Sequence, residues 1–216
     1  MPWDIRLEGL IPLPLLEQQR HPSEIWDKDQ VLFKQNDSYL IEAPSGRGKT
    51  SLLSIIYGLR KDYRGQVYLN GEATDRLGSR AWSRIRKESL SFIFQGLELF
   101  EEITAMENIR LKNSITGYKS ESEIEAMAYE LGIGDSLAKK TGILSFGQKQ
   151  RVAIIRALCQ PFKFLLADEC FSHMDNDNSK KGFDLILAEC RKQQAGLLLT
   201  TLSSSREIPT GKALIL

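Results

Sequence analysis

Short apolar runs alternate with helically spaced apolar residues along this chain, and the alternation predicts an α/β fold. Near the N-terminus, β-rich runs at 31–33 and 39–42 are separated by a turn-forming Asn-Asp pair, so each run predicts a strand. The segment 66–71 predicts a strand that enters a tight turn, because Asn70-Gly71 tolerates the positive φ angles of hairpins. The chain up to about Asp75 therefore has strand character.

The rest of the chain predicts helices and buried strands. Apolar residues at helical spacing predict a helix that ends near Gly58, and they are Leu52, Leu53, Ile55, Ile56 and Leu59. The continuous apolar runs 164–167 and 196–201 are typical of parallel strands covered on both faces, and 180–194 between them predicts the crossover helix. A last strand is expected at 213–216. The whole pattern predicts an α/β sheet with an antiparallel edge and a helical insertion at about 97–144.

Bulk composition adds few constraints. The 216 residues are 42% hydrophobic and 26% charged, which is ordinary for a soluble globular protein, so we expect one domain over 1–216. A formal net charge of +1 gives no reason to expect nucleic acid as a partner. No apolar run approaches the roughly 20 residues that span a bilayer. The cysteines lack metal-ligand spacing, which favours a reduced, cytosolic chain.

The segment from Ala43 to Thr50 has the pattern of a phosphate-binding loop. Gly46 and Gly48 let the backbone curl, so that its N–H groups and the start of the following helix form a nest for a phosphate. In such a loop Lys49 reaches the β- and γ-phosphates, and the Thr50 hydroxyl binds Mg²⁺. The alternative is a glycine-rich turn that binds nothing. The predicted ATP-binding residues of this loop are Ser45, Gly46, Arg47, Gly48, Lys49, Thr50 and Ser51.

Two carboxylates end the predicted strand at 164–167. Asp168 is placed to hold Mg²⁺, directly or through water. Glu169 is placed to orient and polarise an attacking water as a catalytic base. The alternative is that the pair serves as an N-cap feature of the next helix.

Between these two sites lies the string 144–148, Leu-Ser-Phe-Gly-Gln, and this order of motifs resembles the ATP-binding cassette (ABC) family. The resemblance implies a P-loop NTPase with a mostly parallel core sheet, an antiparallel β subdomain and a helical subdomain. It also implies that a signature segment contacts the ATP held by a partner subunit. That segment corresponds to Ser145, Phe146, Gly147 and Gln148. The alternative for Ser145 is a simple helix cap.

Further segments resemble the same family. Gln95, after the β-rich run 92–94, matches the Q-loop glutamine, which in relatives contacts Mg²⁺ and the attacking water. The run 96–109 resembles the lipoprotein-release, macrolide-export and cell-division ABC ATPases. Asp175 matches the D-loop aspartate, which implies a place at the dimer seam.

The chain departs from the family pattern at several positions. Ala43 stands for the usual first glycine of the loop, and Phe146 for the first glycine of the signature. Relatives carry a switch histidine after the strand equivalent to 197–199, whereas this chain has Thr-Thr-Leu-Ser-Ser-Ser at 200–205. A hydroxyl supplies no cation, so we expect slow hydrolysis. Trp26 is the candidate for stacking on adenine, with core packing as an equal alternative.

The sequence therefore predicts an ATPase that uses ATP and Mg²⁺ and works as a homodimer or as a pair with a related ABC subunit. Its expected partner is a membrane permease on a separate chain, which would place it in the cytoplasm against the inner face of the membrane. The alternative is a non-transport ABC ATPase that regulates a membrane or envelope partner through ATP-dependent dimerisation with slow hydrolysis. The cargo is not predicted.

Overall fold

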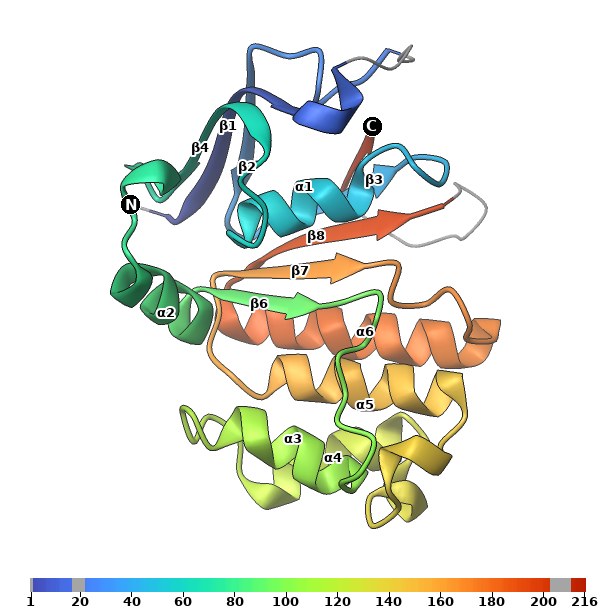
Figure 1. Cartoon of the computed structure of the whole chain (residues 1–216). Helices are drawn as coiled ribbons and strands as arrows, with labels where there is room; N and C mark the ends of the chain where they lie inside the picture. The colour runs from blue at the N-terminus through green and yellow to red at the C-terminus, as the bar shows by residue number, and fades with distance from the viewer. Residues whose placement is uncertain (1, 17–21, 203–210) are drawn as a thin grey trace.

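The computed structural model describes residues 2–16, 22–202 and 211–216, and its strands form two separate sheets (Figure 1). The first sheet is antiparallel, with the strand order β2-β1-β4-β5. The second is parallel, with the order β6-β7-β8-β3-β9. The predicted antiparallel edge is thus a sheet of its own, which packs over the parallel sheet with α1 between them (Figure 1).

The antiparallel sheet is built from the first part of the chain. β1 pairs with both β2 and β4, and its alternation of polar and apolar residues buries Ile5 and Leu7 toward the core. The predicted tight turn is confirmed, because Asn70 and Gly71 have φ angles of 51° and 79°. The strands of this sheet are β1 (Asp4–Pro12), β2 (Gln30–Lys34), β4 (Tyr63–Leu69) and β5 (Glu72–Ala73).

The parallel sheet carries the continuous apolar runs, and both of its faces are covered. Leu166 and Leu198 belong to the core shared with α1 and the antiparallel sheet, whereas Leu165 and Leu197 belong to the core under α5 and α6. Alternate residues therefore enter opposite cores, which is why no polar positions interrupt these runs. The strands are β3 (Ser38–Glu42), β6 (Leu90–Ile93), β7 (Phe164–Asp168), β8 (Gly196–Thr201) and β9 (Lys212–Ile215).

The helices lie in layers around the parallel sheet. Below it lie α5 and α6, and below them lie α3 and α4, which occupy the predicted helical insertion at 97–144 (Figure 1). α3 packs closely on α5, and both contribute to one apolar core. The helices are α1 (Lys49–Ile56), α2 (Ser79–Glu88), α3 (Ala105–Asn113), α4 (Glu121–Glu130), α5 (Phe146–Leu158) and α6 (Asn176–Gln193). No helix within the described ranges is long and apolar enough to cross a membrane.

Candidate active site

The glycine-rich loop connects β3 to α1 and has the backbone geometry that its sequence predicts. Gly46 and Gly48 have φ angles of 79° and 95°, a region that favours glycine. A Cβ atom on Gly48 would also lie 2.9 Å from the Leu15 side chain. Gly48 therefore serves two needs, a left-handed turn at the start of α1 and close packing against the segment after β1.

The Lys49 side chain curls back under this loop. Its side chain is 4% exposed, and its Nζ atom donates hydrogen bonds to the carbonyl oxygens of Ala43 (2.6 Å) and Pro44 (3.0 Å). Nζ also lies 3.2 Å from Oε1 of Glu169. The ammonium group is thus held by the backbone of its own loop and by a carboxylate from the end of β7.

Gln95 joins this cluster from the end of β6. Its Nε2 atom donates to Oε2 of Glu169 over 3.4 Å, and its Oε1 atom accepts from the Thr50 hydroxyl over 3.4 Å. The fold therefore brings together Lys49, Thr50, Gln95 and Glu169, four residues that are up to 120 positions apart in the sequence. Glu169 has a φ of 46°, a strained backbone conformation for a residue with a side chain.

Asp168 lies beneath this cluster and is only 1% exposed. Its Oδ1 atom accepts a hydrogen bond from the Thr200 hydroxyl at 2.7 Å, and that same hydroxyl accepts the N–H of Glu169 at 3.1 Å. Its Oδ2 atom is buried and has no hydrogen-bond partner among the described residues. A buried carboxylate oxygen without a donor is an unsatisfied acceptor that a cation or water would satisfy.

The residues present fit Mg²⁺. Mg²⁺ prefers oxygen ligands, and in phosphate-binding sites it takes only one or two of them from the protein and the rest from phosphate and water. The Thr50 hydroxyl and the Gln95 carbonyl supply two such oxygens 3.4 Å apart, and the unsatisfied Oδ2 atom of Asp168, the residue before Glu169, supplies another. No group of three or more His, Cys, Asp or Glu side chains able to hold a metal occurs in the described part of the chain.

A hollow of about 260 Å³ opens over this cluster. One wall is the phosphate loop with Gln95 and Glu169. The other wall is formed by Pro12, Pro14 and Leu15, at and just after the end of β1, a segment that the sequence left without an interpretation. These three apolar residues are the part of the site that motif reading misses, because no motif marks them.

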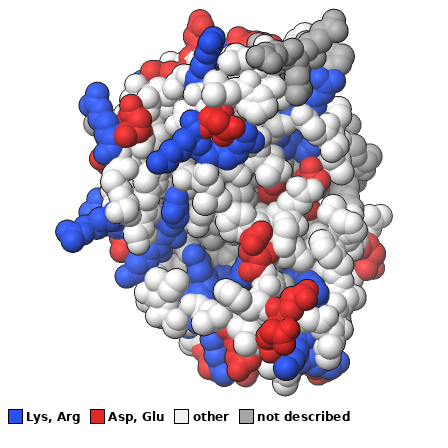
Figure 2. All heavy atoms as spheres, viewed as in Figure 1, with Lys and Arg blue, Asp and Glu red and all other residues white. Residues whose placement is uncertain are grey.

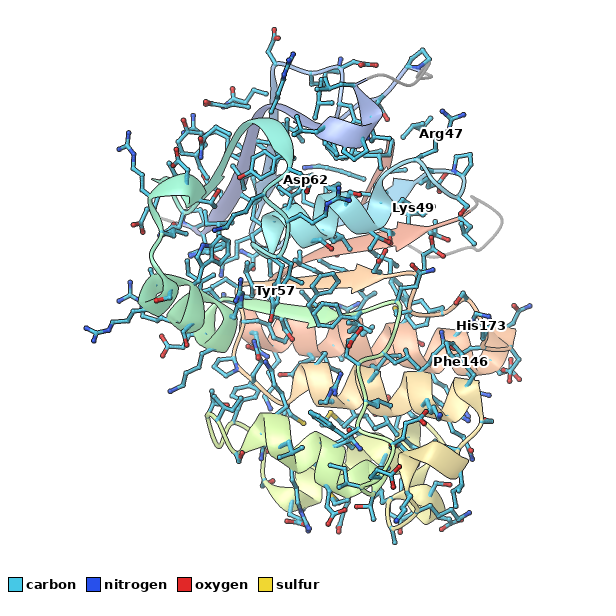
Figure 3. All side chains as sticks on the ribbon, in the orientation of Figure 1. Arg47, Lys49, Tyr57, Asp62, Phe146 and His173 are labelled. Atoms are coloured by element: carbon cyan, nitrogen blue, oxygen red, sulfur yellow. The ribbon has the colours of Figure 1, made fainter. Side chains whose placement is uncertain are left out.

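Two predicted binding residues do not line this hollow. Trp26 is 4% exposed, and its Nε1 atom lies 3.4 Å from the Arg47 carbonyl oxygen, beneath Gly48. Such a buried ring has no free face for adenine, so the stacking prediction is wrong and the core-packing alternative holds. The Arg47 side chain lies outside the lining residues and extends away from the loop toward the edge of the molecule (Figure 3).

The predicted signature segment forms the start of α5. The Ser145 hydroxyl accepts the N–H of Gln148 at 3.2 Å, and the Gln148 side chain accepts the N–H of Ser145 at 3.0 Å. This capping box fixes the first turn of the helix. Phe146 is 45% exposed, and its ring meets that of His173 edge-on with centroids 4.5 Å apart. A Cβ atom on Gly147 would lie 3.3 Å from the His173 carbonyl oxygen, so the start of α5 is in close contact with the segment that precedes Asp175.

The remaining predicted site residues are Asp175 and the segment that follows β8. The Asp175 carboxylate caps α6 by accepting the N–H of Asn178 at 2.8 Å, and this bond lowers the pKa of the carboxyl. Phe146 and His173 lie on the same edge of the molecule as Lys49 but apart from it (Figure 3). Residues 203–205, where the switch histidine is missing, lie outside the described residues.

Comparisons with known proteins agree with this arrangement. A family model described as ABC transporter matches residues 29–172. Lipoprotein-releasing system ATP-binding protein LolD 2 of Rhodopseudomonas palustris is 33% identical over 181 residues, 82% of this chain and 78% of that protein. LolD of Aquifex aeolicus is 34% identical over 86% of this chain and 83% of its own length. A solved ATP-binding cassette, dimeric in a post-hydrolysis state with ADP and Pi, matches with a TM-score of 0.74 at 27% identity, covering 92% and 88% of the two chains.

Proposed function

The chain belongs to the ABC transporter family as an ATP-binding and ATP-hydrolysing subunit, and we propose that two copies close head to tail on ATP and drive a separate membrane permease. The relatives named for lipoprotein release support a permease of the lipoprotein-release or macrolide-export type. On this proposal residues 1–216 form one ATPase domain, which sits in the cytoplasm on the inner face of the membrane through its permease. Nucleic acid is not a partner.

The observation that carries this proposal is the cluster of Lys49, Thr50, Gln95 and Glu169 at the mouth of the phosphate loop. The ammonium of Lys49 and the N–H groups of the loop bind the β- and γ-phosphates. Glu169 accepts a proton from the attacking water, and Gln95 orients that water through the amide that already touches Glu169. Thr50, Gln95 and Asp168 would hold Mg²⁺, which when bound would supply positive charge beside the transferred phosphoryl group.

The placement of the signature supports a second copy. Ser145 to Gln148 lie on the same edge as the phosphate loop but apart from it, so one chain does not surround its own nucleotide (Figure 3). A two-fold, head-to-tail pair lets each signature reach the phosphates held by the other chain, with Asp175 at the seam. The dimeric state of the solved relative is consistent with such a pair, either of two copies or of this chain with a related ABC subunit.

A second function is supported by the residues around Thr200. Its single hydroxyl proton is used by Asp168, so this side chain has no proton left to donate to a γ-phosphate. Slow hydrolysis would suit a non-transport ABC ATPase that regulates a membrane or envelope partner through ATP-dependent dimerisation. A turnover rate in the complex that matches intact transporters would exclude this second function.

Glu169→Gln tests the two functions together. The variant keeps the shape of the side chain but loses the base, so we expect it to bind ATP, stay closed and lose about 10²–10⁴-fold in turnover. The tagged variant is expressed in its native cell, its membranes are solubilised with ATP and Mg²⁺, and co-purifying proteins are identified. A multi-span permease in stoichiometric amount supports transport, whereas only single-span or soluble envelope proteins support regulation. Lys49→Met in the same background is the control that weakens ATP binding.

A further inference from the structure

His173 is an exposed imidazole that three contacts hold against the start of α5. Its ring meets the Phe146 ring edge-on with centroids 4.5 Å apart, and its Nδ1 atom lies 2.8 Å from the Ser172 hydroxyl oxygen. Its carbonyl oxygen lies so close to Gly147 that a Cβ atom there would be 3.3 Å away. Figure 3 shows Phe146 and His173 together on the same edge of the molecule as Lys49. The imidazole therefore has a fixed place beside the predicted signature segment.

The hydrogen bonds behind this ring decide which of its two nitrogens carries the proton. The buried Gln150 side chain donates from Nε2 to the Ser172 hydroxyl oxygen over 3.5 Å. The proton of that hydroxyl has one acceptor among the described residues, the Nδ1 atom of His173. A neutral imidazole that accepts at Nδ1 carries its own proton on Nε2. Within the described ranges this Nε2–H group has no acceptor, so it is a free donor at the surface.

The two cations in the first two turns of α5 are already engaged within the chain. Lys149 pairs with Glu101 at 2.7 Å, and Arg151 is held by hydrogen bonds to other segments. In Figure 2 the Lys and Arg side chains gather mainly on the left, whereas acidic side chains lie at the middle of the right edge. The Ser145 hydroxyl and the His173 Nε2–H group, by contrast, each have a proton without an acceptor among the described residues. A phosphate brought to this place would therefore be bound by neutral donors.

We propose that the Nε2–H group of His173 donates a hydrogen bond to the γ-phosphate of the ATP bound by the partner subunit, beside Ser145. The inference rests on the proposed function, because it assumes the head-to-tail dimer in which Ser145 to Gln148 reach that phosphate. Phosphate oxygens only accept hydrogen bonds, so an N–H group without an acceptor is complementary to them. In the chain that holds the ATP, Thr200 cannot make this contact, because its proton is used by Asp168.

This contact acts during hydrolysis as well as during closure. Water attacks the γ-phosphorus and gives its proton to Glu169, while the bond from the γ-phosphorus to the β–γ bridging oxygen breaks and ADP leaves with that oxygen. His173 keeps its proton throughout and contributes only the hydrogen bond to a phosphoryl oxygen that carries charge in the transition state. We therefore expect His173 to increase both the stability of the ATP-bound dimer and its turnover.

The first test measures the dissociation constant of the ATP-bound dimer by analytical ultracentrifugation in the Glu169→Gln background. His173→Phe keeps an aromatic ring against Phe146 but has no donor. Losing one hydrogen bond to a charged group weakens an interaction by about tenfold or more, and the dimer has two such bonds, so we expect a dimer about a hundredfold weaker. His173→Gln, whose amide nitrogen can take the place of Nε2, should recover most of this loss. His173→Asn is one methylene shorter and should behave like His173→Phe.

Tyr129→Ala removes an exposed ring from α4 and is the matched control, which should dimerise normally. The ATP affinity of the monomer should be unchanged in every variant, because His173 does not line the hollow over its own phosphate loop. Equal dissociation constants for His173→Phe and for the chain with His173 intact would overturn the proposal. Equal losses in all three His173 variants would also overturn it, because they would show a role that does not depend on a donor at Nε2.

The second test determines which ATP His173 contacts. Chains with Glu169→Gln and chains with His173→Phe are mixed before ATP and Mg²⁺ are added. Each mixed dimer then has one site that combines an intact Glu169 with an intact His173 from the other chain. Turnover of the mixture should therefore exceed the sum of the two chains measured separately by several-fold. No gain on mixing would contradict a contact with the partner's ATP.

The proposed function and this inference fail in different ways. If the Glu169→Gln chain with His173 intact forms no ATP-dependent dimer, the proposed function fails together with this inference. If that chain dimerises and His173→Phe dimerises as tightly, the proposed function stands and the role of His173 is wrong.

Discussion

At the residue scale, Lys49 and its contacts show how one side chain connects distant segments. Its ammonium group is held by Ala43, Pro44 and Glu169, and its side chain is almost fully buried. These partners keep the side chain in one position at the mouth of the loop. A phosphate that binds there meets a preorganised cation and avoids most of the cost of ordering a flexible lysine.

Lys49→Met should therefore weaken ATP binding by about ten- to a hundredfold, the expected effect of losing one charge-assisted hydrogen bond to phosphate. Methionine keeps the length and apolar stem of the side chain, so the fold should persist. Titration calorimetry with ATP and Mg²⁺ measures the change. Arg47→Met is the matched control and should change the affinity little, because the Arg47 side chain does not line the hollow. Equal losses in both variants would contradict the assigned geometry.

The contact between Phe146 and His173 yields a second prediction at this scale. An edge-on aromatic pair stabilises a fold by about 0.5–1.5 kcal/mol beyond the contribution of its buried area. Because Phe146 is partly exposed, we expect the interaction energy of this pair to lie at the lower end of that range. A double-mutant cycle with Phe146→Ala and His173→Ala should give a coupling of about 0.5–1 kcal/mol in the free energy of unfolding by urea. Tyr129→Ala combined with His173→Ala should be additive. An additive result for the first pair would show that the rings do not interact.

At the element scale, capping boxes fix the starts of three helices, α3, α4 and α5. At α4 the Glu123 carboxylate accepts the N–H of Ser120 at 2.9 Å, while Ser120 caps the helix in return. This bond, followed by a hydrogen bond from Lys192 on α6, lowers the pKa of Glu123 to about 2. The buried pair of Lys119 and Glu189, 2.7 Å apart, adds a second connection between the start of α4 and α6.

The lowered pKa of Glu123 makes part of the stability depend on pH. Because the folded-state pKa lies below the ordinary value of 4.5, the contribution is fully present above that pH and is lost as the pH falls toward 2. Urea unfolding between pH 2.5 and 6 should show a shallower pH dependence in Glu123→Gln, since glutamine accepts the same hydrogen bond without titrating. Glu125→Gln, an exposed change on the same helix, should leave the dependence unchanged. An identical slope in all three chains would refute the assignment.

At the scale of the whole molecule, the phosphate loop and the predicted signature segment at the start of α5 lie on the same edge of the chain but do not meet. Phosphate-binding groups surround Lys49, and the exposed start of α5 lies lower on that edge (Figure 3). In the proposed head-to-tail pair, dimerisation and ATP binding are therefore separable: a change at Ser145 should affect the first and not the second.

Ser145→Asp tests this separation in the Glu169→Gln background. Aspartate caps a helix as well as serine does, so the fold should be retained, but its charge repels the phosphates of the partner's ATP. We expect ATP-dependent dimers to disappear in analytical ultracentrifugation while ATP affinity of the monomer stays the same. Ser120→Asp makes the identical change in the capping box of α4 and should dimerise normally. Undiminished dimers of Ser145→Asp would rule out the head-to-tail arrangement.

The sequence by itself determined the features that depend on neighbours along the chain. The phosphate loop, the capped start of α5, the turn at Asn70-Gly71 and the apolar strands β7 and β8 were all predicted, because backbone geometry and burial on both faces leave a local pattern. The alternation of polar and apolar residues around Ile5 and Leu7 is also a local pattern of this kind, and it is typical of the half-buried strand β1.

Only the tertiary structure decided which distant segments meet. It assigned the neighbouring strands β2 and β3 to different sheets, buried Trp26 under the phosphate loop, and placed Pro12, Pro14 and Leu15 across the hollow from Lys49. The physical reason is that the periodicity of apolar residues indicates whether a side chain is buried but not which segment buries it. Contacts between segments far apart in the sequence are set by the packing of the whole chain.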